Sequence, residues 1–362
     1  MESTLGKNIK VTIFGGSHEK VIGCTINGFP EKTLDFDHEK LQHFLDLRAP
    51  GGSPFATKRK EPDRFEIAAD DSFDDICNDR QMTFIIRNTD QRSGDYKTLR
   101  NVPRPGHADY TARIRYGDEL NMAGGGPFSA RMTAPLCIAG GIALQYLEKK
   151  GIRIAAHLLS VGDVQDQPFD PMEPDISTAS ESLKRTFLPV LDTASGKEMA
   201  DTILSAAAQK DSIGGVIEVA ATGIPAGIGG AMYDGLESFL APIYFGIPAV
   251  KGLEFGAGFA ASRMKGSENN DAYTVTDGHI TTKTNNAGGI LGGITNGMPL
   301  IARIAFKPTP SIARMQDSVD LQTMQPEKLE IRGRHDPCVA VRAVPIVIAA
   351  TALGILDAML DL

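Results

Sequence analysis

The sequence predicts an α+β protein built on antiparallel sheets, and three observations support this fold class. Short stretches rich in β-branched residues, many bounded by glycine or proline, are typical of strands. Longer stretches carry alanine, leucine and isoleucine at helical spacing. The two kinds of stretch do not alternate in a regular strand–helix–strand rhythm. A doubly wound parallel sheet is therefore less favoured than antiparallel sheets.

The predicted strands contain valine, isoleucine, threonine and phenylalanine, whose side chains pack well on a pleated surface. Glycine or proline often stands beside them and indicates a turn. We place the strands at 11–14 (VTIF), 21–27, 82–87 (MTFIIR), 213–221 and 301–306 (IARIAF).

Four helices are predicted, over residues 38–47, 130–150, 197–210 and 344–360. The last three carry alanine, leucine and isoleucine at helical spacing. The segment 344–360 is also the longest apolar stretch of the chain. We interpret it as a buried helix opened by Pro345 at its first turn, where a missing N–H costs no hydrogen bond.

The length of 362 residues suits one large domain or two modest ones. The stretch 163–198 is rich in Asp, Pro, Ser and Thr and is the best candidate for a long surface excursion. Nothing in it requires a domain boundary. We therefore expect a single domain over residues 1–362. The net charge of −8 makes nucleic acid an unexpected partner.

The cysteines and the apolar segments bear on the compartment. No two cysteines are spaced as CxxC and no His/Cys cluster accompanies them, so we expect reduced thiols and neither a disulfide nor a metal site. The first ten residues contain no apolar signal core. The stretch 344–360, broken by Asp357, is too short and mixed for a membrane span. A soluble cytoplasmic protein without a membrane partner is predicted. The four cysteines are Cys24, Cys77, Cys137 and Cys338.

Two segments place histidine in a glycine-containing turn. GGSHE (15–19) directly follows a predicted strand, so His18 can reach a ligand. A solvent-exposed turn histidine is the alternative. RPGHADY (104–110) brings an arginine, a histidine and an aspartate together around a Pro-Gly turn, which can present a cation and a proton carrier together. A structural turn with surface charges is equally compatible with this pattern.

Three further segments combine glycine with charged or hydroxyl groups. GGGPFSAR (124–131) leads into a predicted helix, where backbone N–H groups can meet an anion, or it is a flexible connector. The segment 285–311 is glycine-dense and ends in a lysine and hydroxyl groups, which suits a phosphate or cofactor. GRHDPC (333–338) sets an arginine near a carboxylate, which can tune its proton affinity or form only an ion pair.

Histidines, arginines and an aspartate in glycine-rich loops are common to these segments. No metal-ligand set accompanies them, nor a nucleophile and base in a known spacing. The residues therefore indicate an anionic substrate and proton transfers, but they do not identify a reaction.

Several long segments, in order along the chain, closely resemble the signature segments of chorismate synthases. The resemblance extends from about Gly6 to Pro345, with a poorly matching middle at roughly 155–205. The matching segments are KRKEPD (58–63), TDQRS (89–93), RPGHADYT (104–111), DSIGG (211–215), AVKGLEFGAGF (249–259), GSENND (266–271), NNAGGILGGITNG (285–297) and GRHDPCVAVRAVPI (333–346).

The resemblance implies a fold, an assembly and a reaction. Helices are expected to be sandwiched between antiparallel sheets, in a protein that forms a homotetramer. The implied substrate is 5-enolpyruvylshikimate 3-phosphate, from which an anti-1,4-elimination removes phosphate and a proton to give chorismate. Reduced flavin mononucleotide (FMN) is the implied cofactor, although no net redox change occurs, and the protein supplies orientation and proton management.

Catalytic roles are implied for three residues at matching positions. His18 is similar to the histidine thought to protonate the leaving phosphate. His107 resembles the histidine thought to protonate reduced flavin. Asp336 matches the aspartate thought to help the flavin take up the substrate proton. Each role is a positioned proton transfer.

Binding roles are also implied by the resemblance. Arginine suits these binding roles because its planar guanidinium group can make two hydrogen bonds to an oxyanion. The arginines expected to hold the substrate or the flavin are Arg48, Arg104, Arg131 and Arg334. Flavin contacts are implied for Ser129, Ala249, Gly292, Lys307, Thr309 and Ser311, and also for Arg334.

The chain departs from the family pattern in its loops. The family's G-E-S-H-G is GGSHE here, so glutamate and glycine are exchanged. Two of three arginines in R-R-R-P-G are absent from LRAPG (47–51). In GGGPFSARMT (124–133), Pro127 and Phe128 stand where an arginine and a serine are expected near FMN, and Met132 replaces a glutamate.

Two functions follow from this pattern. The first is a working chorismate synthase. The alternative is a divergent paralogue without this activity that binds flavin or another anionic ligand in a regulatory role. The sequence leaves open whether NADPH serves as a reductant through the protein itself or through an outside enzyme.

Overall fold

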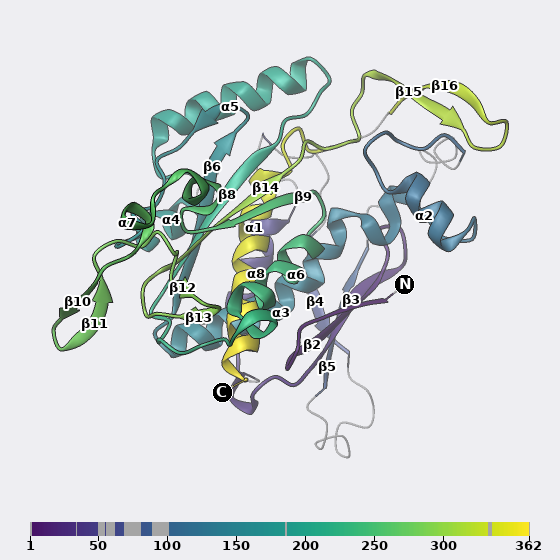
Figure 1. Ribbon diagram of the computed structural model, residues 1–362. Helices are drawn as coiled ribbons and strands as arrows, with labels where there is room; N and C mark the ends of the chain where they lie inside the picture. Colours follow the sequence, from purple (N-terminus) through teal and green to yellow (C-terminus); the bar gives the residue numbers. More distant parts are fainter. Residues whose placement is uncertain are drawn as a thin grey trace.

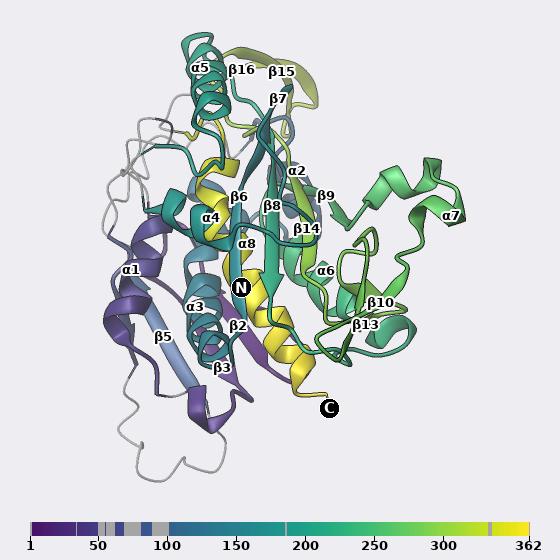
Figure 2. The ribbon, with the colours of Figure 1, turned by 90° about the vertical axis from the view of Figure 1, so that its left-hand side faces the viewer.

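Two five-stranded antiparallel sheets enclose a layer of helices (Figures 1 and 2). The expectation of helices between antiparallel sheets is thus confirmed. Cys77, the TDQRS segment (89–93) and Arg334 lie outside the described residues. This computed structural model describes residues 2–33, 35–49, 55, 62–68, 81–88, 101–184, 187–331 and 335–361.

The first sheet is built from the N-terminal part of the chain. Its order is β1 (Glu2–Leu5), β2 (Lys10–Gly15), β3 (Val21–Asn27), β5 (Met82–Arg87) and β4 (Phe65–Ile67). Every neighbouring pair is antiparallel. The predicted strands at 11–14, 21–27 and 82–87 correspond to β2, β3 and β5.

The second sheet joins segments from the middle and the end of the chain. Its order is β7 (Val164–Gln165), β6 (Arg153–Val161), β8 (Gly215–Thr222), β14 (Leu300–Phe306) and β9 (Val250–Phe255). All its pairings are antiparallel as well. The strands predicted near 213–221 and at 301–306 are confirmed as β8 and β14.

The helical layer contains α1 (His38–Arg48), α3 (Thr133–Lys149), α6 (Leu236–Gly246) and α8 (Ala340–Met359). Helix α3 packs on β3 and on α8, and α8 packs on β6 and β8. Figure 2 shows α3 and α8 between the two sheets. Asp37 caps α1 by accepting hydrogen bonds from the N–H groups of residues 39 and 40.

Smaller elements surround this frame. Two hairpins, β10–β11 and β15–β16, project from it (Figure 1). The predicted helices 38–47, 130–150 and 197–210 correspond to α1, α3 and α5. The remaining elements are the helices α2 (Asp109–Tyr116), α4 (Ile176–Leu183), α5 (Thr193–Ala208) and α7 (Gly266–Asn269), the strands β10 (Tyr273–Thr276), β11 (His279–Thr282), β12 (Ile290–Leu291), β13 (Ile294–Thr295), β15 (Met315–Asp320) and β16 (Gln325–Glu330), and the 3-10 helices η1 (Glu31–Thr33), η4 (Ala123–Phe128), η5 (Ala130–Met132), η6 (Met232–Asp234) and η7 (Gly258–Arg263).

Helix α8 is the central apolar element, as predicted, but it begins at Ala340, so Pro345 lies in the second turn. Within the described chain it is the one helix long and apolar enough to span a bilayer. However, 94% of its most apolar 18-residue stretch is buried inside the protein, as in a core helix. Asp357 interrupts this apolar stretch because its carboxylate accepts hydrogen bonds of 2.6–2.7 Å from the backbone N–H groups of residues 7–9.

The prediction of a surface excursion over 163–198 is partly wrong. This stretch contains β7, α4 and the beginning of α5. Phe169 and Ala179 are buried against Ala155 and Ala220 on the face of the second sheet that points away from α8. The segment therefore covers one face of the sheet, and its Asp and Ser content reflects helix caps such as Asp175.

The crossing of α3 and α8 depends on Gly140. A Cβ atom at Gly140 would lie 2.4 Å from the Ala349 carbonyl oxygen and from its Cβ, so a side chain there would force the two helices apart. We expect Gly140→Ala to lower the free energy of unfolding by about 3 kcal/mol, measured by urea denaturation. Gly141→Ala is the control, because the atoms nearest to its new Cβ belong to the Leu41 and Phe44 side chains. Equal stability of the two variants would contradict this account.

A buried row of charged groups crosses the second sheet. His157 on β6 lies 3.0 Å from Asp166 and 3.3 Å from Glu218 on β8, and none of the three side chains is exposed. Glu218 also accepts a hydrogen bond of 2.8 Å from Arg303 on β14. Burial acts to lower the pKa of His157, but the hydrogen bonds to the two carboxylates outweigh it and raise that pKa above its ordinary value.

A raised folded-state pKa makes the stability depend on pH. The contribution of His157 is fully present below the unfolded-state pKa of about 6.5 and is lost as the pH rises through the folded-state pKa. We therefore expect the free energy of unfolding to fall from pH 6.5 upward, and His157→Gln to weaken that dependence. His279→Gln, on the exposed β10–β11 hairpin, should retain it. An unchanged pH dependence in His157→Gln would contradict the assignment.

Candidate active site

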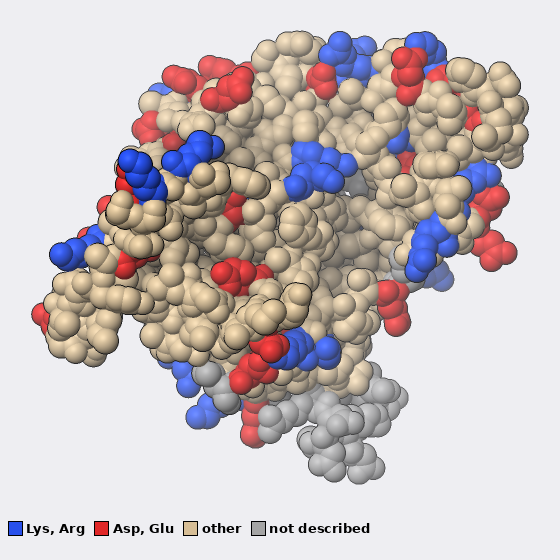
Figure 3. All heavy atoms as spheres, in the orientation of Figure 1, with Lys and Arg blue, Asp and Glu red and all other residues tan. Residues whose placement is uncertain are grey.

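A cavity of about 1090 Å³ lies where the two sheets and the helical layer meet. One part of its wall is polar and includes arginine, lysine, histidine and aspartate side chains. Another part is apolar and includes Phe239, Pro242 and Ile243 of α6. Figure 3 shows a hollow near the centre of one face of the molecule, with basic side chains beside it. Such a cavity suits an anionic ligand together with a flat apolar group.

The RPGHAD turn forms one cluster in the cavity wall. Gly106 adopts a φ of +71°, which permits the sharp turn. Arg104 binds Asp109 through Nε and Nη2, each at 2.7 Å from a carboxylate oxygen. His107 Nδ1 lies 2.8 Å from Asp109 Oδ1 and 3.1 Å from Arg104 Nη2.

The proton on His107 Nδ1 follows from these contacts. Since Arg104 cannot accept a hydrogen bond, Nδ1 either donates to Asp109 or accepts from Arg104. Arg104 already donates to both Asp109 oxygens, so we assign the Nδ1 proton to the shorter His107–Asp109 contact. Burial raises the pKa of Asp109, but the hydrogen bonds from Arg104 and His107 outweigh it, and the pKa lies below its ordinary value. Asp109 thus stays ionised and orients the imidazole.

The GGG loop (residues 124–126) packs against both histidine-containing turns, GGSHE and RPGHAD. Gly124, Gly125 and Gly126 have φ values of 63°, 92° and 51°, a backbone conformation that favours glycine. A Cβ on Gly125 would lie 3.3 Å from His107 Nε2. One on Gly124 would lie 2.2 Å from the His18 ring. The loop thus packs closely against the two imidazoles.

His18 occupies the turn between β2 and β3. The Ser17 N–H donates to the Gly126 carbonyl at 3.2 Å, which joins this turn to the GGG loop. Gly124 lines the cavity, and His18 lies behind it in the described part of the chain. His18 is therefore near the cavity wall, whereas His107 and Asp336 form part of that wall.

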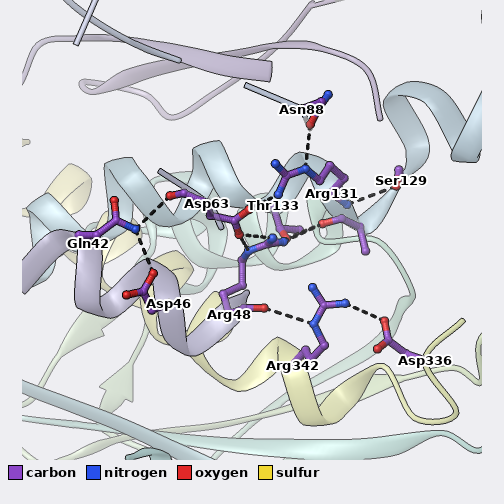
Figure 4. A network of polar contacts seen from close by, with 11 residues as sticks. Gln42, Asp46, Arg48, Asp63, Asn88, Ser129, Arg131, Thr133, Asp336 and Arg342 are labelled. Atoms are coloured by element: carbon purple, nitrogen blue, oxygen red, sulfur yellow. Dashed lines mark hydrogen bonds and ion pairs between the residues drawn. The ribbon is translucent and has the colours of Figure 1, made fainter. Parts of the chain in front are cut away.

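An arginine cluster forms the second polar part of the wall (Figure 4). Arg48 and Arg131 both form ion pairs with Asp63, and all three side chains are almost completely buried. Arg48 also donates to Thr133 Oγ1 at 3.1 Å. Arg131 Nε donates to Asn88 Oδ1 at 3.0 Å. The cluster joins helix α1, the start of α3 and the ends of β4 and β5.

Asp336 lies at the edge of the same network. Its carboxylate accepts a hydrogen bond of 2.9 Å from Arg342 Nη1, and Arg342 Nε donates to the Arg48 carbonyl at 3.2 Å. Burial lowers the pKa of Arg342 below its ordinary value, although Asp336 partly offsets this. The arginine of GRHDPC, Arg334, lies outside the described residues, and among those that the structure describes Arg342 donates to Asp336.

Most of the expected flavin-contacting residues gather in the cavity. Ser129, Ala249, Lys307, Thr309 and Ser311 all line it. The Lys307 N–H donates to the Ala249 carbonyl at 2.9 Å, and its Nζ donates to the Gly106 carbonyl at 2.6 Å. These bonds tie the ends of β9 and β14 to the RPGHAD turn.

Ala249 and Gly292 differ in their surroundings. Ala249 has a φ of +77°, a strained conformation for a residue with a side chain, at a position in the cavity wall. Gly292 lies in the tight β12–β13 turn, where an added Cβ would meet no atom within 4 Å, and it does not belong to the cavity wall among the described residues. Of the seven expected residues, Arg334 lies outside the described part of the chain, and the structure brings together five of the other six and leaves Gly292 apart.

Three charged residues of the site received no role from the sequence. Asp63, Asp109 and Arg342 lie within KRKEPD, RPGHADY and GRHDPCVAVR, but only their partners were assigned functions. For Asp109, the arginine and histidine in the same turn were a usable signal. Asp63 pairs with Arg48 and Arg131, which lie 15 and 68 residues away in the sequence, and no local pattern indicates those pairs. Arg342 lies six residues after its partner Asp336, in the first turn of α8.

Comparisons with known proteins give one family. The chorismate synthase profile matches residues 9–360. A chorismate synthase from Lancefieldella parvula is 44% identical over 369 residues, covering 99% of this chain and 96% of that protein. One from Korarchaeum cryptofilum is 41% identical and covers 97% and 96%. A crystal structure of chorismate synthase superposes with a TM-score of 0.75 at 24% identity, covering 98% of this chain and 93% of the other.

Proposed function

The chain belongs to the chorismate synthase family, and we propose that it converts 5-enolpyruvylshikimate 3-phosphate to chorismate by anti-1,4-elimination of phosphate, dependent on reduced FMN. It is an enzyme of the carbon–oxygen lyase class. The observation that carries the specific reaction is the convergence of His107 and Asp336, from distant parts of the chain, on one cavity lined with arginines.

The described residues fit a flavin. Thr309 Oγ1 is buried and has no hydrogen-bond partner among the described residues, so a polar ligand atom can satisfy it. The apolar part of the wall, with Phe239 and Ile243, suits a flat ring. Lys307 adds a cation close by. When bound, reduced FMN supplies electron density to the reacting centre.

The chain's own residues manage charge and protons. Arg104 and Arg131 face the cavity and favour an anionic substrate. His107, oriented by Asp109 through Nδ1, can transfer a proton at Nε2. Asp336, held by Arg342, can accept one at its carboxylate. We assign His18 to protonation of the leaving phosphate, and Arg48 and Arg334 to anion binding, on the family resemblance.

A second function is favoured by the departures from the family pattern in the segment 124–133. Pro127, Phe128 and Met132 line the cavity where the family pattern has an arginine, a serine and a glutamate. Phe128 packs against Tyr116 with ring centroids 6.3 Å apart, so this part of the wall is more apolar than the pattern implies. A paralogue that binds flavin or another anion in a regulatory role would fit such a wall.

Anaerobic turnover separates the two functions. Purified protein is incubated with the substrate and chemically reduced FMN, and chorismate and phosphate are measured. Release of both in equal amounts supports the lyase reaction. Tight flavin binding without turnover by folded protein would favour the regulatory function. A parallel reaction with oxidised FMN and NADPH tests whether the protein reduces its own flavin.

Three further properties accompany this proposal. We propose that residues 1–362 act as one domain, in keeping with a large apolar core cluster that draws on both sheets and on the helices between them. We also propose a homotetramer and a cytoplasmic location, both on the family resemblance. Size-exclusion chromatography with light scattering tests the assembly.

A further inference from the structure

The carboxylate of Asp63 lies at the centre of the arginine cluster and behind the cavity wall. Its side chain is completely buried, whereas Arg48 and Arg131 both line the cavity. We propose that Asp63 is a positioning residue for the reaction: it fixes both arginines and sets the positive charge that they present to an anionic ligand. The proposal rests on the proposed function and goes beyond the roles assigned above.

The geometry divides the Asp63 carboxylate between two cations. Oδ2 accepts hydrogen bonds from Arg48 Nε and Nη2, and Oδ1 accepts one from Arg131 Nη1 (Figure 4). Each guanidinium is also held from another direction, Arg48 by Thr133 and Arg131 by Asn88. With both oxygens engaged, the two guanidinium planes are fixed relative to each other.

Asp63 itself is anchored independently of the arginines. Its backbone carbonyl accepts a hydrogen bond of 3.1 Å from Gln42 Nε2 on α1, and the same Gln42 nitrogen donates to Asp46 at 3.0 Å. The segment that carries Asp63 leads directly into β4 (Phe65–Ile67). The carboxylate is thus placed by α1 and the first sheet, and the arginines adopt positions around it.

Charge gives Asp63 a second effect. Two buried guanidinium groups and one carboxylate carry one net positive charge. Burial raises the pKa of Asp63, but the charges of Arg48 and Arg131 outweigh it and keep the pKa below its ordinary value, so the carboxylate stays ionised. Without it, two cations would face each other in the protein interior, and the wall would attract any small anion more strongly.

The cluster also connects to the candidate catalytic carboxylate. Arg48 is the last residue of α1, and its carbonyl accepts the hydrogen bond from Arg342 Nε. Arg342 in turn binds Asp336. A shift of Arg48 after loss of Asp63 would therefore displace the partner of Asp336, in addition to the anion-binding arginines.

Asp63→Asn separates placement from simple attraction. We expect kcat/KM for 5-enolpyruvylshikimate 3-phosphate to fall about 10–100-fold, because small displacements of binding groups are costly. Inorganic phosphate, which needs no fixed orientation, should bind about tenfold more tightly, because one negative charge is gone. Calorimetric titration of the purified protein at low ionic strength measures the second change. Unchanged kcat/KM, or unchanged or weaker phosphate binding, would overturn the proposal.

Asp63→Glu tests the placement of the carboxylate alone. It also tests the positioning role if Asp63→Asn does not fold, because loss of one partner from a buried ion pair is strongly destabilising. The charge is retained but the carboxylate moves by one methylene group. We expect kcat/KM to fall while the Kd for phosphate stays at its wild-type value. A wild-type kcat/KM in this variant would overturn the positioning role.

Asp166→Asn is the matched control, because Asp166 is an equally buried, ion-paired aspartate remote from the cavity. It should lose stability but keep the wild-type kcat/KM and phosphate affinity. If it lowers kcat/KM as much as Asp63→Asn does, general destabilisation replaces positioning as the explanation. Absence of turnover in the wild-type protein would defeat the proposed function instead, and the phosphate titrations would then decide the effect of Asp63.

Discussion

Asp336→Asn is expected to lower kcat for the elimination by about 10²–10⁴-fold, the usual contribution of a positioned proton acceptor. The amide has nearly the same shape as the carboxylate, and its oxygen can still accept the hydrogen bond from Arg342 Nη1. It cannot take up a proton at neutral pH. The substitution should therefore affect kcat far more than KM.

The measurement is steady-state turnover with reduced FMN under anaerobic conditions, together with the Kd for flavin. Asp317→Asn is the control, because Asp317 is also an ion-paired aspartate, with Lys328, but lies on the exposed β15–β16 hairpin. It should retain wild-type kcat. A normal kcat in Asp336→Asn would show that Asp336 carries no proton in the rate-limiting step, and a raised KM alone would restrict it to binding.

His107→Gln is expected to have an effect of similar size, a decrease in kcat of about 10²–10⁴-fold. The imidazole is fixed by Asp109 at 2.8 Å and packs against the GGG loop, so its Nε2 has a defined position in the cavity wall. Glutamine retains hydrogen-bonding groups but cannot exchange a proton near neutral pH. Flavin affinity should change little, because the loop and Asp109 remain.

The pH dependence of kcat provides a second measurement for His107. A proton transfer at the imidazole gives a limb of the pH–rate profile that disappears in His107→Gln. His279→Gln, on the exposed β10–β11 hairpin, serves as the control and should leave the profile unchanged. If His107→Gln keeps the wild-type profile and rate, the proton is carried elsewhere, and His18 becomes the next residue to test.

The sequence alone predicted the elements whose patterns are strong. β2, β3, β5, β8 and β14 follow runs of β-branched residues, and α3, α5 and α8 follow helical spacing. It missed β6, which contains Ala155, Ala156 and the polar His157 where an apolar run would be expected. Its histidine is satisfied by Glu218 on the neighbouring strand, and that pairing is visible only once β6 and β8 are adjacent.

The candidate site likewise has features that the sequence predicted and features that only the structure shows. Composition and motifs identified loops rich in glycine, histidine and arginine, and hence an anionic ligand and proton transfer. Glycine indicates a local backbone conformation, and a histidine in a turn is a candidate proton carrier by its residue type, so such features can be read from neighbouring residues. His107 and Asp336 were named in this way, and both line the cavity.

The sequence by itself thus determined the fold class and the reactive residue types of this protein. Only the tertiary structure decided which distant charges pair, above all Asp63 with Arg48 and Arg131. A buried ion pair depends on placing two groups within hydrogen-bonding distance, and here those groups come from separate helices, strands and loops. That placement follows from how the sheets and helices pack, which no local run of residues encodes.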